Sequence, residues 1–307
     1  MRPARLLYAI SLICLILPAS SRAGVLDVQA VTQDVWALVG PKDQRDAQNL
    51  ANNATFALVV TPDGAVLVDP GGSWNGAAMI HTAVQGLTEQ PVRYIINTGG
   101  QDHRWLGNGY WQAQGATVIA SEAAVTDQAA RASQQMSGLA QFLGDGLDGT
   151  APAYADVTFE RDYQLELGGL TFEIRHRGQA HTAGDSYVWL PARQTVFTGD
   201  IVYTERLLGN GPQSNVQSWI AVFEAMASLD PVHLVPGHGA ATTLDHARRD
   251  TYDYLMNLRQ QIAALIADGG DIMDAPAIDQ TAFSYLEQFD ALAGRNAQTA
   301  YEQMEWE

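Results

Sequence analysis

Asn97-Thr98-Gly99-Gly100-Gln101-Asp102-His103-Arg104-Trp105-Leu106-Gly107-Asn108 is the stretch on which the interpretation of this sequence depends. It follows an apolar run at residues 92–96 that is typical of a buried strand, and it precedes a helix-like run. Loops after strand ends are where binding and catalytic side chains gather. This position therefore indicates a metal-binding loop, although the loop carries only one histidine and one aspartate.

The composition predicts a globular protein with an acidic surface. The chain has 307 residues, of which 47% are hydrophobic. There are 34 Asp and Glu against 17 Lys and Arg, which gives a formal net charge of -17. Such a surface repels nucleic acid and anionic lipid, so we expect neither as a partner. The expected partner is a small-molecule substrate, and the composition leaves the oligomeric state open.

Residues 1–23 have the pattern of a secretory signal peptide. Two arginines precede an apolar run at residues 6–17, and small residues follow as far as Ala23, the expected cleavage point. The run is too short for a transmembrane helix, although a membrane anchor is the alternative. We therefore expect a periplasmic or secreted protein without a membrane segment after cleavage. Cys14 is the only cysteine, so any metal in the mature chain must be held by His, Asp, Glu or Gln.

Apolar periodicity and turn residues predict two β-rich halves, each followed by helices. The expected strands are a hairpin at 25–39 and runs at 55–60, 65–68, 92–96, 116–120, 156–159, 163–167, 170–175, 186–190, 194–198 and 233–236. The expected helices are at 75–86, 111–113, 123–143, 214–229, 246–268 and 279–305. This order predicts an α/β (α+β) protein, a four-layer αββα sandwich of two mixed β-sheets flanked by helices. No linker separates the halves, so we expect residues 24–307 to form a single domain.

Three further polar sites lie just beyond apolar strands in the second half of the chain. They are Gly178–Asp185, which contains His181, then Phe197–Asp200, and then Val235–Gly239, which contains His238. Imidazole and carboxylate side chains at strand ends are ligands that suit zinc, or less often iron or manganese.

Taken in order with the quoted loop and with Val66-Leu67-Val68-Asp69, these sites resemble the metallo-β-lactamase-fold hydrolases over nearly all of the mature chain. The resemblance implies an αββα sandwich with one or two metals at the edge of the sheets, and a first metal loop of the form T-H-x-H-x-D-H-x-x-G-N. It also implies that Asp69 orients the loop by hydrogen bonding. The pattern around Asn97-Thr98 and at Arg295–Glu302 looks most similar to exported relatives linked to quinoprotein oxidation systems or sulfur metabolism, which indicates no substrate.

The quoted loop departs from the family pattern at its ligand positions. Counted back from Gly107-Asn108, those positions hold Gly99, Gln101, His103 and Arg104, so both histidines of the first-metal pair are missing. In an alternative register, Asp102 and His103 match the family's Asp-His pair. His103 is a candidate ligand in both registers, and the sequence alone does not choose between them.

The resulting expectation is a single Zn²⁺ ion held by His103, His181, Asp200 and His238, with Asp102 as a further candidate. Two ions, or none, are the alternatives. Such a metal would lower the pKa of a bound water, which would attack an ester, thioester or lactam-type bond. Asp102 or Asp200 would take the proton, and Arg104 would hold a carboxylate of the substrate.

The main hypothesis from the sequence is thus an exported, zinc-dependent hydrolase of an unidentified small molecule. The alternative is a non-catalytic binding or accessory protein of the same fold that has lost its metal site. The missing histidines favour the alternative. The retained His181, Asp200 and His238 oppose it, because a decayed site has no physical reason to keep three metal-type side chains at separate strand ends.

Overall fold

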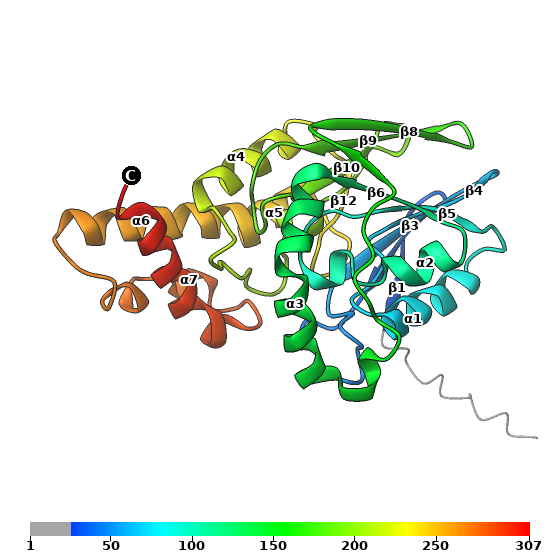
Figure 1. Cartoon of the computed structure of the whole chain (residues 1–307). Helices are drawn as coiled ribbons and strands as arrows, with labels where there is room; N and C mark the ends of the chain where they lie inside the picture. The colour runs from blue at the N-terminus through cyan, green and yellow to red at the C-terminus, as the bar shows by residue number, and fades with distance from the viewer. Residues whose placement is uncertain (1–25) are drawn as a thin grey trace, which may run out of the picture.

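The computed structural model describes residues 26–307, which form two β-sheets packed against each other with helices on the outer sides (Figure 1). One sheet has seven strands in the order β1-β2-β3-β4-β5-β6-β7, and the other has five in the order β12-β11-β10-β9-β8. The predicted sandwich of two mixed sheets is confirmed. The predicted signal peptide at residues 1–23 lies outside the described residues. In the described part of the chain, no helix combines the length and the apolar character needed to span a bilayer.

The seven-stranded sheet is antiparallel in its first half and parallel in its second. Its strands are β1 (Asp27–Thr32), β2 (Val35–Val39), β3 (Thr55–Thr61), β4 (Gly64–Val68), β5 (Val92–Ile96), β6 (Thr117–Ser121) and β7 (Val157–Phe159). The crossovers between its parallel strands carry α1 (Trp74–Gln85), α2 (Asn108–Ala113) and α3 (Glu122–Leu143). Every residue of β4 is buried, because the strand is covered on both faces.

The five-stranded sheet is antiparallel except for its last pair. Its strands are β8 (Asp162–Leu167), β9 (Leu170–His176), β10 (Ser186–Leu190), β11 (Thr195–Phe197) and β12 (His233–Val235). β11 and β12 run parallel, and α4 (Val216–Ala227) lies in the connection between them. Their carboxyl ends therefore point to the same edge of the sheet, where Asp200 and His238 follow.

Three long helices begin at polar cap residues, as local physical chemistry requires. The side chains of Ser73, Ser121 and Asn215 each accept a hydrogen bond from a backbone N–H of the first turn of α1, α3 and α4. Such caps satisfy N–H groups that have no partner inside the helix. These helix starts agree with the sequence prediction to within a few residues.

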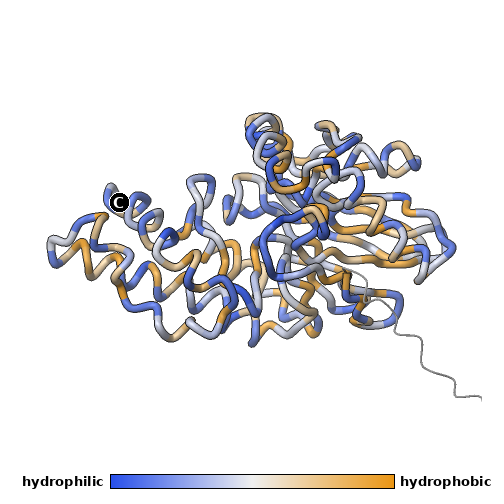
Figure 2. Tube along the Cα trace, turned by 90° about the horizontal axis from the view of Figure 1, so that it is seen from below, coloured by the Kyte–Doolittle hydropathy of each residue, from blue (hydrophilic) through white to orange (hydrophobic). Residues whose placement is uncertain are grey.

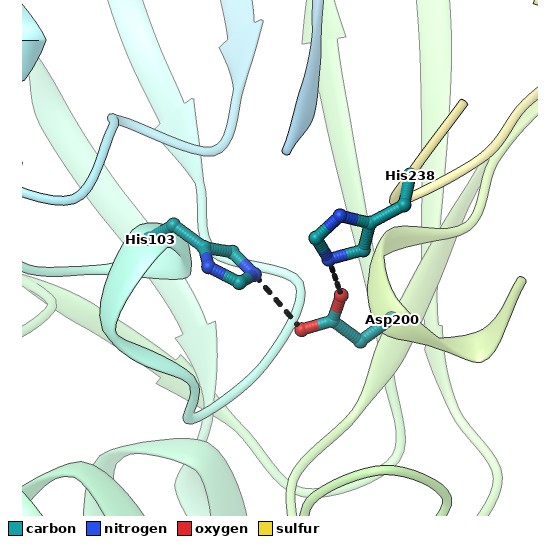
Figure 3. Close-up of side chains that lie close together, drawn as sticks. All are labelled: His103, Asp200 and His238. Atoms are coloured by element: carbon teal, nitrogen blue, oxygen red, sulfur yellow. Dashed lines mark hydrogen bonds and ion pairs between the residues drawn. The ribbon is translucent and has the colours of Figure 1, made fainter. Parts of the chain in front are cut away.

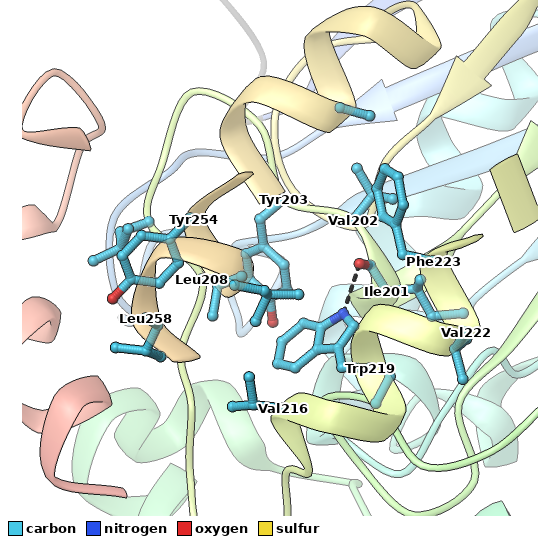
Figure 4. Close-up of a cluster of buried hydrophobic side chains, with 14 of the residues drawn as sticks. Ile201, Val202, Tyr203, Leu208, Val216, Trp219, Val222, Phe223, Tyr254 and Leu258 are labelled. Carbon is cyan, nitrogen blue, oxygen red and sulfur yellow. Dashed lines mark hydrogen bonds between the residues drawn. The ribbon is translucent and has the colours of Figure 1, made fainter. Parts of the chain in front are cut away.

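Apolar residues run along the strands and recur along the helices (Figure 2). One buried cluster lies between the two sheets, a second between the seven-stranded sheet and α1 and α2, and a third beneath α4. In the third, Trp219 is fully buried and its Nε1 donates to the carbonyl of Ile201 at 2.8 Å (Figure 4). This bond joins α4 to the turn that carries Asp200, so the core positions the candidate site.

The C-terminal helices are less regular than predicted. The region expected as one helix at 246–268 comprises α5 (Leu244–Ala247), a π-helical turn and α6 (Asp253–Ala267), and the last helix, α7, spans only Phe289–Met304. α7 packs against a loop of the second half through Asn296, whose side chain binds the backbone N–H of Asn210 and the carbonyl of Leu208, both at 2.8 Å. This contact makes α7 one wall of the cavity described below.

Candidate metal centre

Three buried side chains from three strand ends meet at one carboxylate (Figure 3). His103 lies in a short turn after β5, Asp200 lies in a turn after β11, and His238 follows β12. Their candidate ligand atoms all lie within 4.8 Å of one another, and each residue is at most 3% exposed. His103 Nε2 lies 3.2 Å from one oxygen of Asp200, and His238 Nε2 lies 3.2 Å from the other.

The turn that presents Asp200 requires glycine at its first position. Gly199 has a φ of 50°, in the left-handed region, and a Cβ there would overlap the side chain of Thr98. Asp69 holds the same threonine, since its carboxylate accepts from Thr98 N and Thr98 Oγ1, each at 2.8 Å. These contacts agree with the expectation that Asp69 orients the loop by hydrogen bonding.

The ion pair between Arg45 and Asp102 holds His103 on the side opposite Asp200. Asp102 Oδ1 lies 3.1 Å from His103 Nδ1, and Arg45 binds both oxygens of Asp102 at 2.5 and 2.6 Å. Burial alone raises the pKa of Asp102, but Arg45 and His103 outweigh it and hold that pKa below its usual value. Asp102 is therefore ionised, and its Oδ1 together with Arg45 Nη2, which lies 3.2 Å from Nδ1, holds the ring so that Nε2 faces Asp200.

This arrangement fits a metal ion. His103 lies between two carboxylates, with Nδ1 near Asp102 and Nε2 near Asp200. A metal cation bound to Nε2 would separate that nitrogen from the carboxylate of Asp200. Burial lowers the pKa of His238 well below its usual value, so that ring is neutral and has a lone pair to donate. Two imidazoles and one carboxylate with such supporting carboxylates are a donor set that binds zinc.

Arg104 has a different role from the substrate anchor expected from the sequence. Its side chain is fully buried, and it is not among the residues that line the cavity. One terminal nitrogen donates to Asp69 at 2.9 Å and the other to Asp200 at 2.8 Å, while the carbonyls of Thr55 and Gly237 accept at 3.0 and 2.8 Å. Burial alone lowers the pKa of Arg104, but Asp200 and Asp69 raise it overall. Arg104 is therefore a buried clamp that joins both sheets and holds Asp200 in place.

The expected proton acceptors are also corrected. Both oxygens of Asp102 are taken by Arg45, and both oxygens of Asp200 face basic groups. Burial alone raises the pKa of Asp200, but Arg104 and His103 hold it well below its usual value. Neither carboxylate is a ready base near neutral pH. Asp102 supports a candidate ligand rather than belonging to the three-donor set.

His181 is the expected ligand that the structure leaves outside the three-donor set found among residues 26–307. Its Nδ1 donates to the carbonyl of Gly209 at 2.9 Å, and no protein partner of its Nε2 lies within hydrogen-bond distance in the described residues. Burial lowers the pKa of His181 to about 4, so the ring is neutral near pH 7. His181 lies instead on the wall of the adjoining cavity.

A cavity of about 200 Å³ adjoins the three donors, and His103 and His238 form part of its wall. Sequence reasoning missed two cations in that wall, Arg45 and Arg206, because both lie in segments without regular periodicity. Arg206 immediately precedes the buried pair Leu207-Leu208 in the loop after Asp200. The chain has few basic residues, so a basic residue next to an apolar pair is the sequence signal by which Arg206 could have been recognised as a buried cation.

The space beside Gly99 is filled by a carboxylate rather than by a metal ligand. A Cβ on Gly99 would overlap Asp185 Oδ1. Asp185 is fully buried and accepts from the backbone N–H of Thr182 at 2.8 Å and from the hydroxyl of the same residue. It therefore caps the loop after His181, and burial, followed by the charge of Asp200, raises its pKa to about 8.

This carboxyl group is expected to make the folded protein less stable as the pH rises. In the unfolded chain Asp185 ionises near its ordinary pKa of 3.8, and in the folded protein near 8. Between these values the folded state holds the extra proton, so stability falls by up to about 1.4 kcal/mol per pH unit. Asp185→Asn removes this loss, and urea unfolding of both proteins from about pH 5 to about pH 8 measures it. A difference between them that does not change with pH would contradict the raised pKa.

A four-layer sandwich with imidazole and carboxylate donors at the strand ends of both sheets is the architecture of a class of metal-binding proteins. The chain belongs to the metallo-beta-lactamase superfamily, whose family model matches residues 51–238.

Several solved structures share the fold and carry the names of hydrolases. A metallo-beta-lactamase from Pontibacter korlensis is 24% identical with a TM-score of 0.62, over 76% of this chain and 99% of that chain. The stereoselective inverting sec-alkylsulfatase Pisa1 from Pseudomonas sp. is 13% identical with a TM-score of 0.71, over 91% of this chain and 50% of the sulfatase. The DIM-1 metallo-beta-lactamase is 16% identical with a TM-score of 0.57, over 74% of this chain and 95% of that chain. At these identities the likeness establishes the fold.

Proposed function

We propose that this chain is a metal-dependent hydrolase that holds a single zinc ion with His103, Asp200 and His238. The observation that carries the proposal is the convergence of these three donors beside a cavity that two of them line. Catalytic zinc sites combine three protein ligands with an open position for water or substrate. The three-donor set and its access to the cavity match that requirement.

A single ion is proposed because the loop of residues 97–108 offers too few ligand side chains for a second ion. Gly99 has no side chain, and Asp185 fills the space next to it. Gln101 contributes only a neutral amide, whose buried Oε1 has no hydrogen-bond partner among the described residues. With His181 as the one remaining imidazole nearby, a second ion would lack the anionic or imidazole donors that zinc prefers.

The chain's own residues hold the donors in place. When bound, the zinc ion supplies Lewis-acid chemistry, which lowers the pKa of water and polarises the bond to be broken. Asp102, itself held by Arg45, fixes the orientation of His103. Arg104 fixes Asp200, and the ring of Tyr203 stacks on His238 with centroids 4.5 Å apart. Supports of this kind maintain metal affinity and ligand geometry.

His181 is the proposed proton acceptor. Its Nδ1–H is engaged by Gly209, so the lone pair resides on Nε2, and burial keeps the ring neutral near pH 7. The residue lines the same cavity as His103 and His238. His181 differs from Asp102 and Asp200 in availability and not in basicity, because its Nε2 has no protein partner among the described residues, whereas the oxygens of both carboxylates are paired with basic groups.

The proposed substrate carries an ester, thioester or lactam-type bond. It is a small molecule, because the cavity measures only about 200 Å³. Two structural neighbours are named as lactamases and one as an alkylsulfatase, so a sulfate ester belongs among the candidates to be tested. The pattern of residues 1–23 supports export to the periplasm or beyond as part of the proposal.

The test is a panel of four substrate types, an ester, a thioester, a lactam and a sulfate ester, assayed with zinc-loaded protein. Hydrolysis of at least one is expected, with kcat/KM reduced on the order of 100-fold or more in His238→Ala. His233→Ala is the matched control, because His233 lies on β12 outside the donor set and should keep the activity. If zinc-loaded protein cleaves none of the four, the non-catalytic binding or accessory protein is favoured instead.

A further inference from the structure

The cavity next to the three donors is lined by positive charge on a protein that is strongly negative. The cations in its wall are Arg45, Arg206 and Arg295, and none of its lining residues is Asp or Glu. The chain as a whole has a formal net charge of -17. A local reversal of the overall charge raises the concentration of anions at the cavity and is not needed for solubility.

Arg206 is the cation in this wall that is buried, whereas Arg45 is half-buried and Arg295 is exposed. It is 5% exposed, and its Nε has no hydrogen-bond partner. Its one polar contact within the described residues is from a terminal nitrogen to His238 Nδ1 at 3.5 Å, the limit of a hydrogen bond. Among residues 26–307, no carboxylate lies within ion-pair distance of Arg206, whereas Arg45 is bound by both oxygens of Asp102.

The acidic residues nearest to Arg206 along the backbone pair with another cation. Glu205 precedes it in sequence, and Glu287 pairs with it as an isolated backbone bridge. Both carboxylates bind the ammonium group of Lys42, at 3.1 and 2.7 Å. The fold thus places two carboxylates close by and directs both away from the buried guanidinium.

We propose that Arg206 binds an oxyanionic group of the substrate, a carboxylate, sulfate or phosphate, within this cavity. The proposal rests on the proposed function in that the cavity is taken as the substrate site. A buried cation without a counter-ion is costly, so its retention needs a partner that the protein itself does not supply. The planar fork of arginine donors matches such oxyanions in a bidentate manner.

Zinc binding would make Arg206 still more available. A neutral imidazole that donates its Nε2 lone pair carries its proton on Nδ1. His238 Nδ1 is the acceptor nearest to Arg206, so that weak contact is lost when the proton resides there. All donors of Arg206 then remain for the substrate anion.

The test measures anion binding to metal-free protein, which separates it from any binding to zinc. Calorimetric titrations with inorganic sulfate, inorganic phosphate and acetate compare wild type with Arg206→Gln and with Arg93→Gln. Arg93 is exposed on β5 and outside the cavity, so its variant controls for net charge. We expect Arg206→Gln to weaken the best anion about tenfold or more and Arg93→Gln to leave it unchanged. The ranking of the three anions distinguishes a tetrahedral group from a carboxylate.

A second readout separates binding from a structural role of Arg206. Because an unpaired buried cation opposes folding, Arg206→Gln should raise Tm without added anion, and the best anion should raise the Tm of wild type only. Equal anion affinity of wild type and Arg206→Gln, or no binding by wild type, would overturn the inference. Anion binding by a protein that takes up no zinc would leave the inference standing while the proposed hydrolase fails.

Discussion

Arg104→Met is expected to lower the free energy of unfolding by about 3–5 kcal/mol, the cost of removing one partner from a buried ion pair. Methionine fills much of the same space but leaves Asp69 and Asp200 buried without their shared cation. It also leaves the carbonyls of Thr55 and Gly237 without this donor. Urea denaturation of wild type and variant measures the loss.

Arg104→Lys is the informative comparison for this prediction. Lysine keeps the positive charge, but its single ammonium group cannot reproduce the two-pronged contacts to Asp69 and Asp200. We expect its stability to lie between those of wild type and Arg104→Met. If Arg104→Met unfolds within about 1 kcal/mol of wild type, the guanidinium is not the clamp described here.

Asp200→Asn is expected to reduce zinc affinity about 100-fold or more and to abolish measurable hydrolysis. The substitution keeps the shape of the side chain but removes the anionic oxygens that face His103, His238 and Arg104. Its amide nitrogen would also point a donor at one of these basic groups. Competition titration against a chromophoric chelator measures the affinity.

Asp102→Asn provides a graded control for the same titration. Asp102 orients His103 without belonging to the donor set, and loss of such a support costs about 10–100-fold in metal affinity. The expected order of affinity is therefore wild type, then Asp102→Asn, then Asp200→Asn. Asp200→Asn with wild-type affinity would exclude Asp200 as a ligand.

Local patterns were sufficient to predict most of the fold. The strands β3 and β4 follow from two apolar runs around a Pro-Asp-Gly turn, and α1 begins next to its serine cap. These signals depend on residues that are close together in the sequence, so they can be recognised without a structure. The interruption between α5 and α6 could not be predicted in this way, because it reflects packing against distant parts of the chain.

The site could be predicted only in part. His103, Asp200 and His238 each follow an apolar strand, and this position, their ligand chemistry and the family resemblance together suggested that they would meet. The exclusion of His181 from the donor set and the inward turn of Arg104 depend on side-chain geometry across two sheets. Sequence spacing holds no information about such contacts.

The identity of the base and of the substrate anchor changed for the same reason. Asp102 and Arg104 have the chemistry expected of a base and an anion binder, but the oxygens of Asp102 and the terminal nitrogens of Arg104 are paired with other buried groups. His181 and Arg206 have free donor or acceptor atoms at the cavity and take those roles in our proposals. Which polar group has an unsatisfied atom is a property of the folded chain alone.

The most direct test of the central claim is the zinc content of the purified protein, expressed from residue 24 onward, and of two histidine variants. We predict about one zinc ion per chain in wild type, almost none in His238→Ala, and about one in His181→Ala, which should nevertheless lose activity. Wild-type protein that carries no zinc, or that carries two ions of which one is lost in His181→Ala, would contradict a single ion held by His103, Asp200 and His238.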